Sequence, residues 1–167
     1  AITKGAKITA TASGSSYLGI RQKIADPTQY VGRTFTYSAY ESSNSSQCRL
    51  TTYIQGTYQL VVSNTHSGNG EWEKLSLTFK MTGIPSTAWY VSAFISSPGV
   101  SNTSIATGDF IEIALAQLEL GKVATPFEHR SYGEELALCQ RYFERVDSLD
   151  GNSGMVGGYI TSGSSYY

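Results

Sequence analysis

The sequence is poor in charge. Charged residues make up 15% of its 167 residues, and the net charge at pH 7 is -1. Such a balance provides no electrostatic footprint for nucleic acid or for an anionic membrane. Long apolar runs are also absent, since none reaches the roughly 18 residues that a membrane-spanning helix needs. We therefore expect neither a nucleic-acid partner nor insertion into a membrane.

Cysteine and histidine are scarce as well, with two of each. Cys48 and Cys139 fall in different predicted elements without CxxC spacing, which favours two free buried thiols over a disulfide. His66 and His129 form no HxxxH or HExxH pattern, so no zinc site is predicted. A structural calcium ion stays open as an alternative, although no acidic loop cluster argues for one. We expect no cofactor and no metal.

Ser, Thr and 12 Tyr residues dominate the remaining composition, and apolar residues alternate with polar ones in segment after segment. Such two-residue alternation predicts half-buried strands. The clearest inward sets are Phe35, Tyr37 and Ala39 in 33–40; Leu50, Thr52 and Ile54 in 49–55; Leu75, Leu77, Phe79 and Met81 in 73–81; and Trp89, Val91, Ala93 and Ile95 in 88–96. Turn clusters separate these runs and no helical crossover does, so we predict an antiparallel, all-β sandwich or barrel.

Three local expectations follow from the same pattern. Thr36 and Ser38 should face outward, opposite in parity to Phe35. The segment 41–47, "ESSNSSQ", should be a turn. Residues 109–120, "DFIEIALAQLEL", should form a central and well-covered strand, whose ladder Thr125-Pro126 stops.

A helix should follow. "SYGE" fits a capping box in which Ser131 caps the helix and Glu134 reaches back, so we predict a helix from about Tyr132 to Arg145. Its apolar residues recur at heptad-like spacing, which indicates a narrow seam for a partner helix. That seam contains Leu136, Cys139, Phe143 and Val146. The chain then becomes rich in Gly and Ser over 147–167.

Residues 115–143, "LAQLELGKVATPFEHRSYGEELALCQRYF", carry a resemblance. They are similar to the junction of bacteriophage tail-fibre and tailspike proteins, in which a strand ending in "QLE.G..ATPFE.R" leads into an "ELALCQRYF" helix. Residues 19–43, 70–81 and 108–121 are similar to other strands of the same domains, and together the matches cover most of residues 17–146. The chain thus resembles the receptor-binding proteins of phage tails.

The resemblance implies a jelly-roll sandwich, similar to carbohydrate-binding modules, in a homotrimeric fibre at the virion tail that faces the host. It implies a β-sandwich over 1–130, a connecting helix over 131–146 and the start of an incomplete C-terminal β domain over 147–167. Leu136, Cys139 and Phe143 would form the trimer contacts. The family has further sequence at both ends, so we expect these 167 residues to be a fragment.

A glycan site needs an aromatic ring for the apolar face of a sugar and polar side chains for its hydroxyls. Arg49, Tyr53 and Gln55 share the outward face of one predicted strand, and Tyr90 faces outward on another. Trp72, between Glu71 and Glu73, is a further candidate, although packing is the favoured interpretation for it. The predicted carbohydrate-binding residues are Arg49, Tyr53, Gln55, Tyr90 and Trp72.

Catalysis has weaker support. Glycosidases need two carboxyl groups that face one bond. Glu71 and Glu73 share a face in principle, but such pairs are usually solvated, and Asp109 after Gly108 reads as a turn residue. We expect a host-glycan-binding module that is not an enzyme. A structural spacer of the fibre, and a fragment of a depolymerase whose catalytic domain lies upstream, stay open as alternatives.

Overall fold

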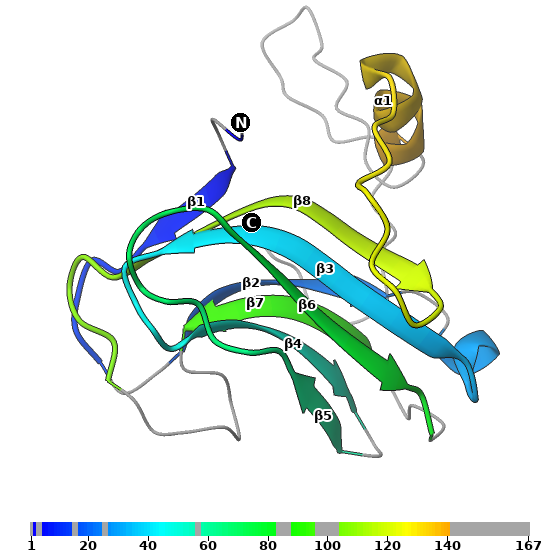
Figure 1. The fold of residues 1–167 in the computed structure, drawn as a ribbon, viewed down its shortest axis with the longest axis horizontal. Helices are drawn as coiled ribbons and strands as arrows, with labels where there is room; N and C mark the ends of the chain where they lie inside the picture. The colour runs from blue at the N-terminus through cyan, green and yellow to red at the C-terminus, as the bar shows by residue number, and fades with distance from the viewer. Residues whose placement is uncertain are drawn as a thin grey trace, which may run out of the picture. The chain divides into compact units, whose positions relative to one another are not determined.

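The computed structural model describes residues 2, 5–14, 17–24, 27–55, 58–82, 88–95 and 104–140. Within them, strands build two four-stranded antiparallel sheets, with the orders β1-β8-β3-β6 and β2-β7-β4-β5 (Figure 1). The strands are β1 (Ala6–Thr9), β2 (Leu18–Ile24), β3 (Thr34–Ser43), β4 (Cys48–Ile54), β5 (Gln59–Val62), β6 (Glu73–Lys80), β7 (Trp89–Ile95) and β8 (Phe110–Leu120). Eight strands in this order form a jelly roll, which confirms the predicted fold class.

The core lies between the two sheets and is built around Trp89, which is fully buried as predicted. The ring of Phe35 lies 5.0 Å from that of Trp89, and the rings of Phe79 and Tyr30 lie within 5.8 Å of it. Tyr30 ends the 3-10 helix η1 (Pro27–Tyr30). The indole N–H donates to Thr52 Oγ1 over 2.8 Å, so this large ring is buried without an unpaired polar atom.

The inward sets predicted from alternation are confirmed, most cleanly in β6, where burial alternates residue by residue. Thr36 and Ser38 were predicted to face outward. They are nevertheless buried, with only 1% and 3% of their surface exposed. Thr36 Oγ1 lies 2.9 Å from Thr78 Oγ1 and donates to the carbonyl of Gly121 over 3.0 Å. The chain after β8 thus covers part of this outer face.

The point at which β8 ends explains why the following chain covers Thr36. β8 lies between β1 and β3 as predicted, but it is not well covered, since most of its residues are only partly buried. It ends at Leu120, which is 61% exposed, and not at Thr125-Pro126. Gly121 has a φ of 124°, a conformation that favours glycine, and it turns the chain back. The carboxylate of Glu119 then accepts hydrogen bonds from the backbone N–H and the hydroxyl of Thr125. The returning segment is therefore tied to its own sheet.

The segment 41–47 was also predicted incorrectly, because β3 continues through Ser43 before the chain turns. Ser43 is fully buried, and its hydroxyl donates to the carbonyl of Phe110 over 2.7 Å. Glu41 is fully buried too. Polar residues that look like a turn in the sequence thus close one end of the sandwich interior.

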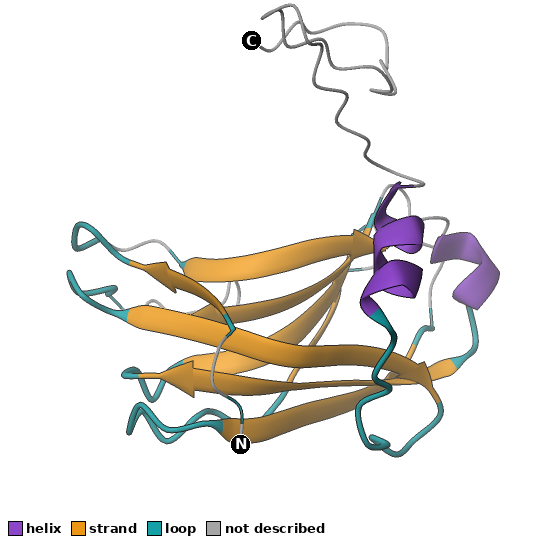
Figure 2. Ribbon diagram, turned by 90° about the horizontal axis from the view of Figure 1, so that it is seen from above, coloured by secondary structure: helices purple, strands orange, loops and turns teal. Residues whose placement is uncertain are grey.

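The chain divides into two compact units, 1–127 and 128–167, and the second is described by itself. Its helix α1 (Tyr132–Gln140) begins where predicted (Figure 2). The capping box is present, since Ser131 N donates to Glu134 Oε2 over 3.0 Å and Glu134 N donates to Ser131 Oγ over 3.3 Å. The predicted continuation to Arg145, the residues Phe143 and Val146, the side chain of Cys139 and the segment 147–167 lie outside the described residues.

Candidate functional site

The outer face of the sheet β2-β7-β4-β5 gathers four of the five predicted ligand residues, and we call it the Tyr53–Tyr90 face. Residues of the opposite parity, such as Leu50 and Trp89, belong to the core. The strand register therefore fixes which side chains point outward. They are Gly19, Arg21 and Lys23 of β2; Tyr90, Ser92 and Phe94 of β7; Arg49, Thr51 and Tyr53 of β4, with Gln55 just beyond it; and Leu60 and Val62 of β5.

Tyr53 and Tyr90 are direct cross-strand partners in the ladder between β4 and β7. Both rings are half-buried, so each keeps part of its surface accessible. Between this pair and the next outward pair, Arg49 opposite Phe94, lie Thr51 and Ser92, which are buried. A ligand would therefore meet the tyrosine rings and the flanking long side chains, and not the floor between them.

Arg49 lies four residues from Tyr53, which is roughly 13 Å along the strand. Its guanidinium donates to the Gln47 side-chain oxygen over 3.3 Å, so it is held near one end of β4. Gln55 is exposed just past the other end, and its backbone N–H donates to the carbonyl of Ala88. The sheet thus brings Arg49, Tyr53, Gln55 and Tyr90 onto one surface.

Arg21 and Lys23 of β2 lie on the same face as the two tyrosines, and the predicted set of site residues did not include them. Lys23 is the cross-strand partner of Tyr90. The guanidinium carbon of Arg21 lies 4.8 Å from the centre of the Tyr90 ring, in a cation–π contact. One side of the Tyr90 ring is therefore already covered by a cation. The neighbour relation between β2 and β7 depends on topology, which alternation alone does not reveal.

Phe94 of β7 has the same outward parity as Tyr90 but is buried beneath neighbouring side chains. It is 6% exposed, and its ring lies so close to Gly19 that a Cβ there would sit 1.7 Å from Phe94 Cδ1. The ring of Tyr17 meets that of Phe94 edge to face at 5.2 Å. Glycine at position 19 thus leaves room for the aromatic ring across the strand.

Trp72 lies elsewhere. It directly precedes β6, in the other sheet, and is partly buried. A Cβ on Gly5 would lie 2.8 Å from Trp72 Cη2, so the indole packs closely on the backbone beside β1. The structure therefore does not bring Trp72 together with the other four candidate residues.

Three carboxylates of the sandwich each accept a hydrogen bond from a backbone N–H group. Glu73 accepts from Ser67 N and from the Ser67 hydroxyl, and these bonds hold the pKa of Glu73 below its usual range. Asp109 Oδ2 accepts from Ala106 N over 2.8 Å in the turn before β8, which agrees with the turn interpretation. Glu112 Oε1 accepts from Gly5 N over 2.8 Å. These contacts give the three carboxylates structural roles in loops and strand ends.

Glu41 is the one strongly perturbed carboxyl group among the described residues. It is 0% exposed, and burial raises its pKa to about 7. The thiol of Cys48, also fully buried, donates to Glu41 Oε2 over 3.0 Å, and Oε1 has no hydrogen-bond partner among the described residues. Cys48 is a free thiol, as predicted, and burial raises its pKa. No solvent-facing surface reaches this pair, so it belongs to the core.

Metal ligation has no support in the part of the chain that the structure describes, where no three His, Cys, Asp or Glu side chains gather. Both ring nitrogens of His66 are used by the backbone, because Gly68 N donates to Nδ1 over 2.8 Å and Nε2 lies 3.0 Å from the Glu71 carbonyl. None of the described helices is long and apolar enough to cross a membrane.

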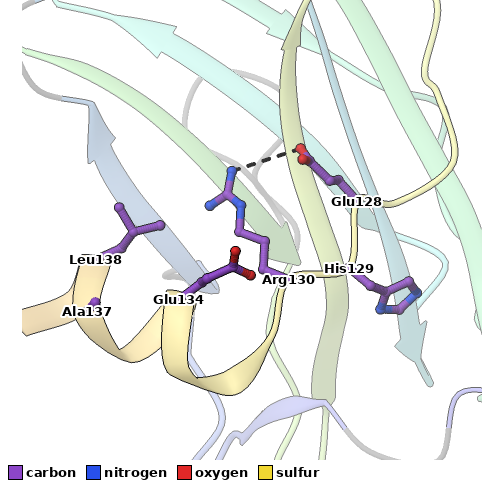
Figure 3. A pocket seen from close by; sticks show the side chains of 6 residues that line it. All are labelled: Glu128, His129, Arg130, Glu134, Ala137 and Leu138. Carbon is purple, nitrogen blue, oxygen red and sulfur yellow. Dashed lines mark ion pairs between the residues drawn. The ribbon is translucent and has the colours of Figure 1, made fainter.

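The second unit contains an open hollow beside the start of α1 (Figure 3). Its lining is Glu128, His129, Arg130, Glu134, Ala137 and Leu138. Arg130 pairs with Glu128 at 4.0 Å and with Glu135 at 3.6 Å, and the first helical turn is already capped by Ser131. Exposed ion pairs of this kind contribute little energy. Glu128, Arg130 and Glu134 of the hollow thus already have polar partners.

Comparison with known proteins adds only architecture. No family model matches the chain, and no curated protein matches it. Among solved structures, a family 16 carbohydrate-binding module matches with a TM-score of 0.47 and 13% identity, over 71% of this chain and 78% of that one. The tripod from the baseplate of bacteriophage Tuc2009 matches with a TM-score of 0.47 and 15% identity, over 77% of this chain and 50% of that one. Likeness at this level does not extend to ligand or activity.

Proposed function

We propose that this chain is a carbohydrate-binding module of a phage tail fibre or tailspike, and that it helps attach the virion to host-surface polysaccharide. The observation that carries the proposal is the adjacent pair of half-buried rings, Tyr53 and Tyr90, on one face with Arg49 and Gln55. Aromatic rings stack on the apolar face of a pyranose, and the flanking polar groups hydrogen-bond its hydroxyls. The placement in a phage tail rests on the sequence resemblance of residues 17–146.

The site in this proposal consists of Arg49, Tyr53, Gln55 and Tyr90. Trp72 belongs to the other sheet, where its contact with the Gly5 backbone supports packing. A role of Trp72 in sugar binding would require a second surface. The proposed activity is binding alone, since the carboxylates of Glu73 and Asp109 already accept hydrogen bonds from backbone N–H groups.

We also propose that the module acts in a homotrimer through Leu136, Cys139 and Phe143. Leu136 is 42% exposed and Leu138 is 39% exposed. Even the predicted helix from Tyr132 to Arg145, about 14 residues, is marginal without packing, so exposed leucines on it call for a partner surface. Three linked sites would also raise the overall avidity without any new contact, because the second and third binding events become intramolecular.

A glycan array with the 167-residue chain tests this function. The variants are Tyr53→Ala and Tyr90→Ala, and the matched control is Tyr40→Ala, a half-buried outward tyrosine that pairs with Lys74 on the other sheet. We expect the wild type and the control to bind a bacterial polysaccharide on the array, and both site variants to lose that binding. If all four proteins bind alike, or if none binds any glycan, the spacer alternative replaces the binding proposal.

A further inference from the structure

Charge is segregated between the two sheets of the sandwich. The strands β2, β4, β5 and β7 contain no Asp or Glu, yet they carry Arg21, Lys23 and Arg49. The described carboxylates of the sandwich all lie in the other sheet or in loops, namely Glu41, Glu71, Glu73, Asp109, Glu112 and Glu119. A chain of net charge -1 thus presents a sheet that is purely cationic.

All three cations point out on the Tyr53–Tyr90 face. Lys23 is opposite Tyr90, and Arg21 lies over the Tyr90 ring. Arg49 is on β4, two strands from β2, so Arg21 and Arg49 are roughly 12 Å apart at the backbone. Lys23 and Arg21 therefore lie on the β2 side of the tyrosine pair, and Arg49 lies farther along β4 toward the same end as Arg21.

The two arginines are held in place by neutral groups. Arg21 rests on an aromatic ring, and Arg49 is bonded to Gln47. Neither arginine nor Lys23 makes an ion pair with a carboxylate of the described residues. The ion pairs among those residues are formed by Arg130 with Glu128 and Glu135. Like charges gathered on one face repel one another, and a bound anion relieves that repulsion. Arginine in particular matches planar carboxylates and phosphates through two parallel hydrogen bonds.

We propose that the ligand of this face is an acidic glycan, in which carboxylate or phosphate groups lie on Arg21, Lys23 and Arg49 while a sugar ring lies on the tyrosine pair. The inference rests on the proposed function and adds the class of polysaccharide. The tyrosines supply affinity for the ring, and the cations select the charged polymer over its neutral counterpart. Carboxylate from uronic or sialic acids and phosphate from polyol-phosphate polymers share this chemistry.

Titration calorimetry of the full 167-residue chain at 0.15 M salt tests the inference. The probes are polygalacturonate oligomers and polysialic acid for carboxylate, a glycerol-phosphate polymer for phosphate, and carboxyl-reduced polygalacturonate as the neutral match. Variants are Arg21→Gln and Arg49→Gln. The matched control is Lys80→Gln, an exposed lysine at the end of β6 in the other sheet. Duplex DNA tests whether charge alone is sufficient.

We expect an acidic polymer to bind at least about tenfold more tightly than the neutral match, and each arginine variant to lose about tenfold of that affinity. Lys80→Gln should bind as wild type does. Equal affinity for acidic and neutral oligomers, with loss in Tyr53→Ala, would overturn the acidic ligand and leave the proposed function standing. Equal binding of DNA would show that the face responds to charge alone. Absence of binding to every probe and to the glycan array would overturn both proposals.

Discussion

Tyr53 of β4 and Tyr90 of β7 stand directly opposite each other in the antiparallel ladder, with the Arg21 guanidinium 4.8 Å from the centre of the Tyr90 ring. Opposite residues in a ladder have Cβ atoms about 5 Å apart, so the two rings start from adjacent positions on one face of the sheet. Both tyrosines lie within strands, Tyr53 in β4 and Tyr90 in β7. Preorganised aromatic area of this kind loses little conformational entropy when a ligand binds.

The sandwich should lose stability as pH rises through the acidic range. Burial raises the pKa of Glu41 from 4.5 to about 7, so between these values the unfolded chain ionises Glu41 while the folded chain keeps it protonated. The stabilisation is complete below about pH 4.5 and should be lost by about pH 7, a change of about 3 kcal/mol. Urea unfolding from pH 4.5 to 8 measures it.

Glu41→Gln cannot ionise, so its unfolding free energy should not show this fall. Glu73→Gln is the control, because the pKa of the exposed Glu73 is lowered and its own contribution changes only at lower pH. Parallel curves for wild type and Glu41→Gln would show that Glu41 is not protonated in the folded state near neutral pH.

Gly19→Ala should destabilise the sandwich by about 2 kcal/mol and weaken glycan binding. The added methyl would meet the Phe94 ring and the carbonyl of Ala93 at 2.4 Å, so the aromatic packing under the face must shift. Gly133→Ala in α1 is the control, since nothing lies within 4 Å of its Cβ, and it should stabilise the helix by up to about 1 kcal/mol. Chemical unfolding and calorimetry measure both effects, and an unchanged Gly19→Ala protein would contradict this packing.

Trp72→Ala should separate packing from recognition. Loss of the partly buried indole beside Gly5 should lower the unfolding free energy by about 2 kcal/mol. Glycan affinity should stay within about twofold of wild type, because Trp72 lies in the other sheet. Loss of glycan binding by a folded Trp72→Ala protein would show that Trp72 contacts the ligand. Trp72 would then belong to the site together with the four residues of the Tyr53–Tyr90 face.

Leu136→Glu should dissociate the proposed homotrimer. A charge on this 42% exposed leucine would lie in the proposed apolar contact, where an unpaired charge is costly. Analytical ultracentrifugation should show three chains for wild type and one for the variant, with the affinity for a single short oligosaccharide unchanged. The control is Glu135→Gln, which alters the neighbouring residue without adding charge. A monomeric wild type would refute the trimer for this chain.

The sequence predicted the parts of the structure that depend on local alternation. The inward set of β6, the burial of Trp89 and the outward parity of Tyr53 and Tyr90 all follow from a period of two, and the capping box at Ser131 follows from helix-end chemistry. These features need only a few neighbouring residues to specify them.

What alternation could not predict depends on contacts between distant segments. Arg21 joins the site only because β2 pairs with β7, although Tyr90 lies far along the chain. Thr36 is buried because the chain returns over its sheet after Gly121. Glu41 looked like a turn residue, yet it closes one end of the interior against Cys48. The sequence shows that four strands lack acidic residues. Only the sheet order shows that these four strands form one sheet.

The most direct test of the central claim is an NMR titration of the chain, labelled in its tyrosine rings, with a polysaccharide retained on the glycan array. We predict that the ring signals of Tyr53 and Tyr90 shift on binding and saturate together, while those of the buried Tyr37 and of Tyr40 on the other sheet stay in place. Shifts confined to Tyr40, or saturation of binding without any change at Tyr53 and Tyr90, would contradict the account.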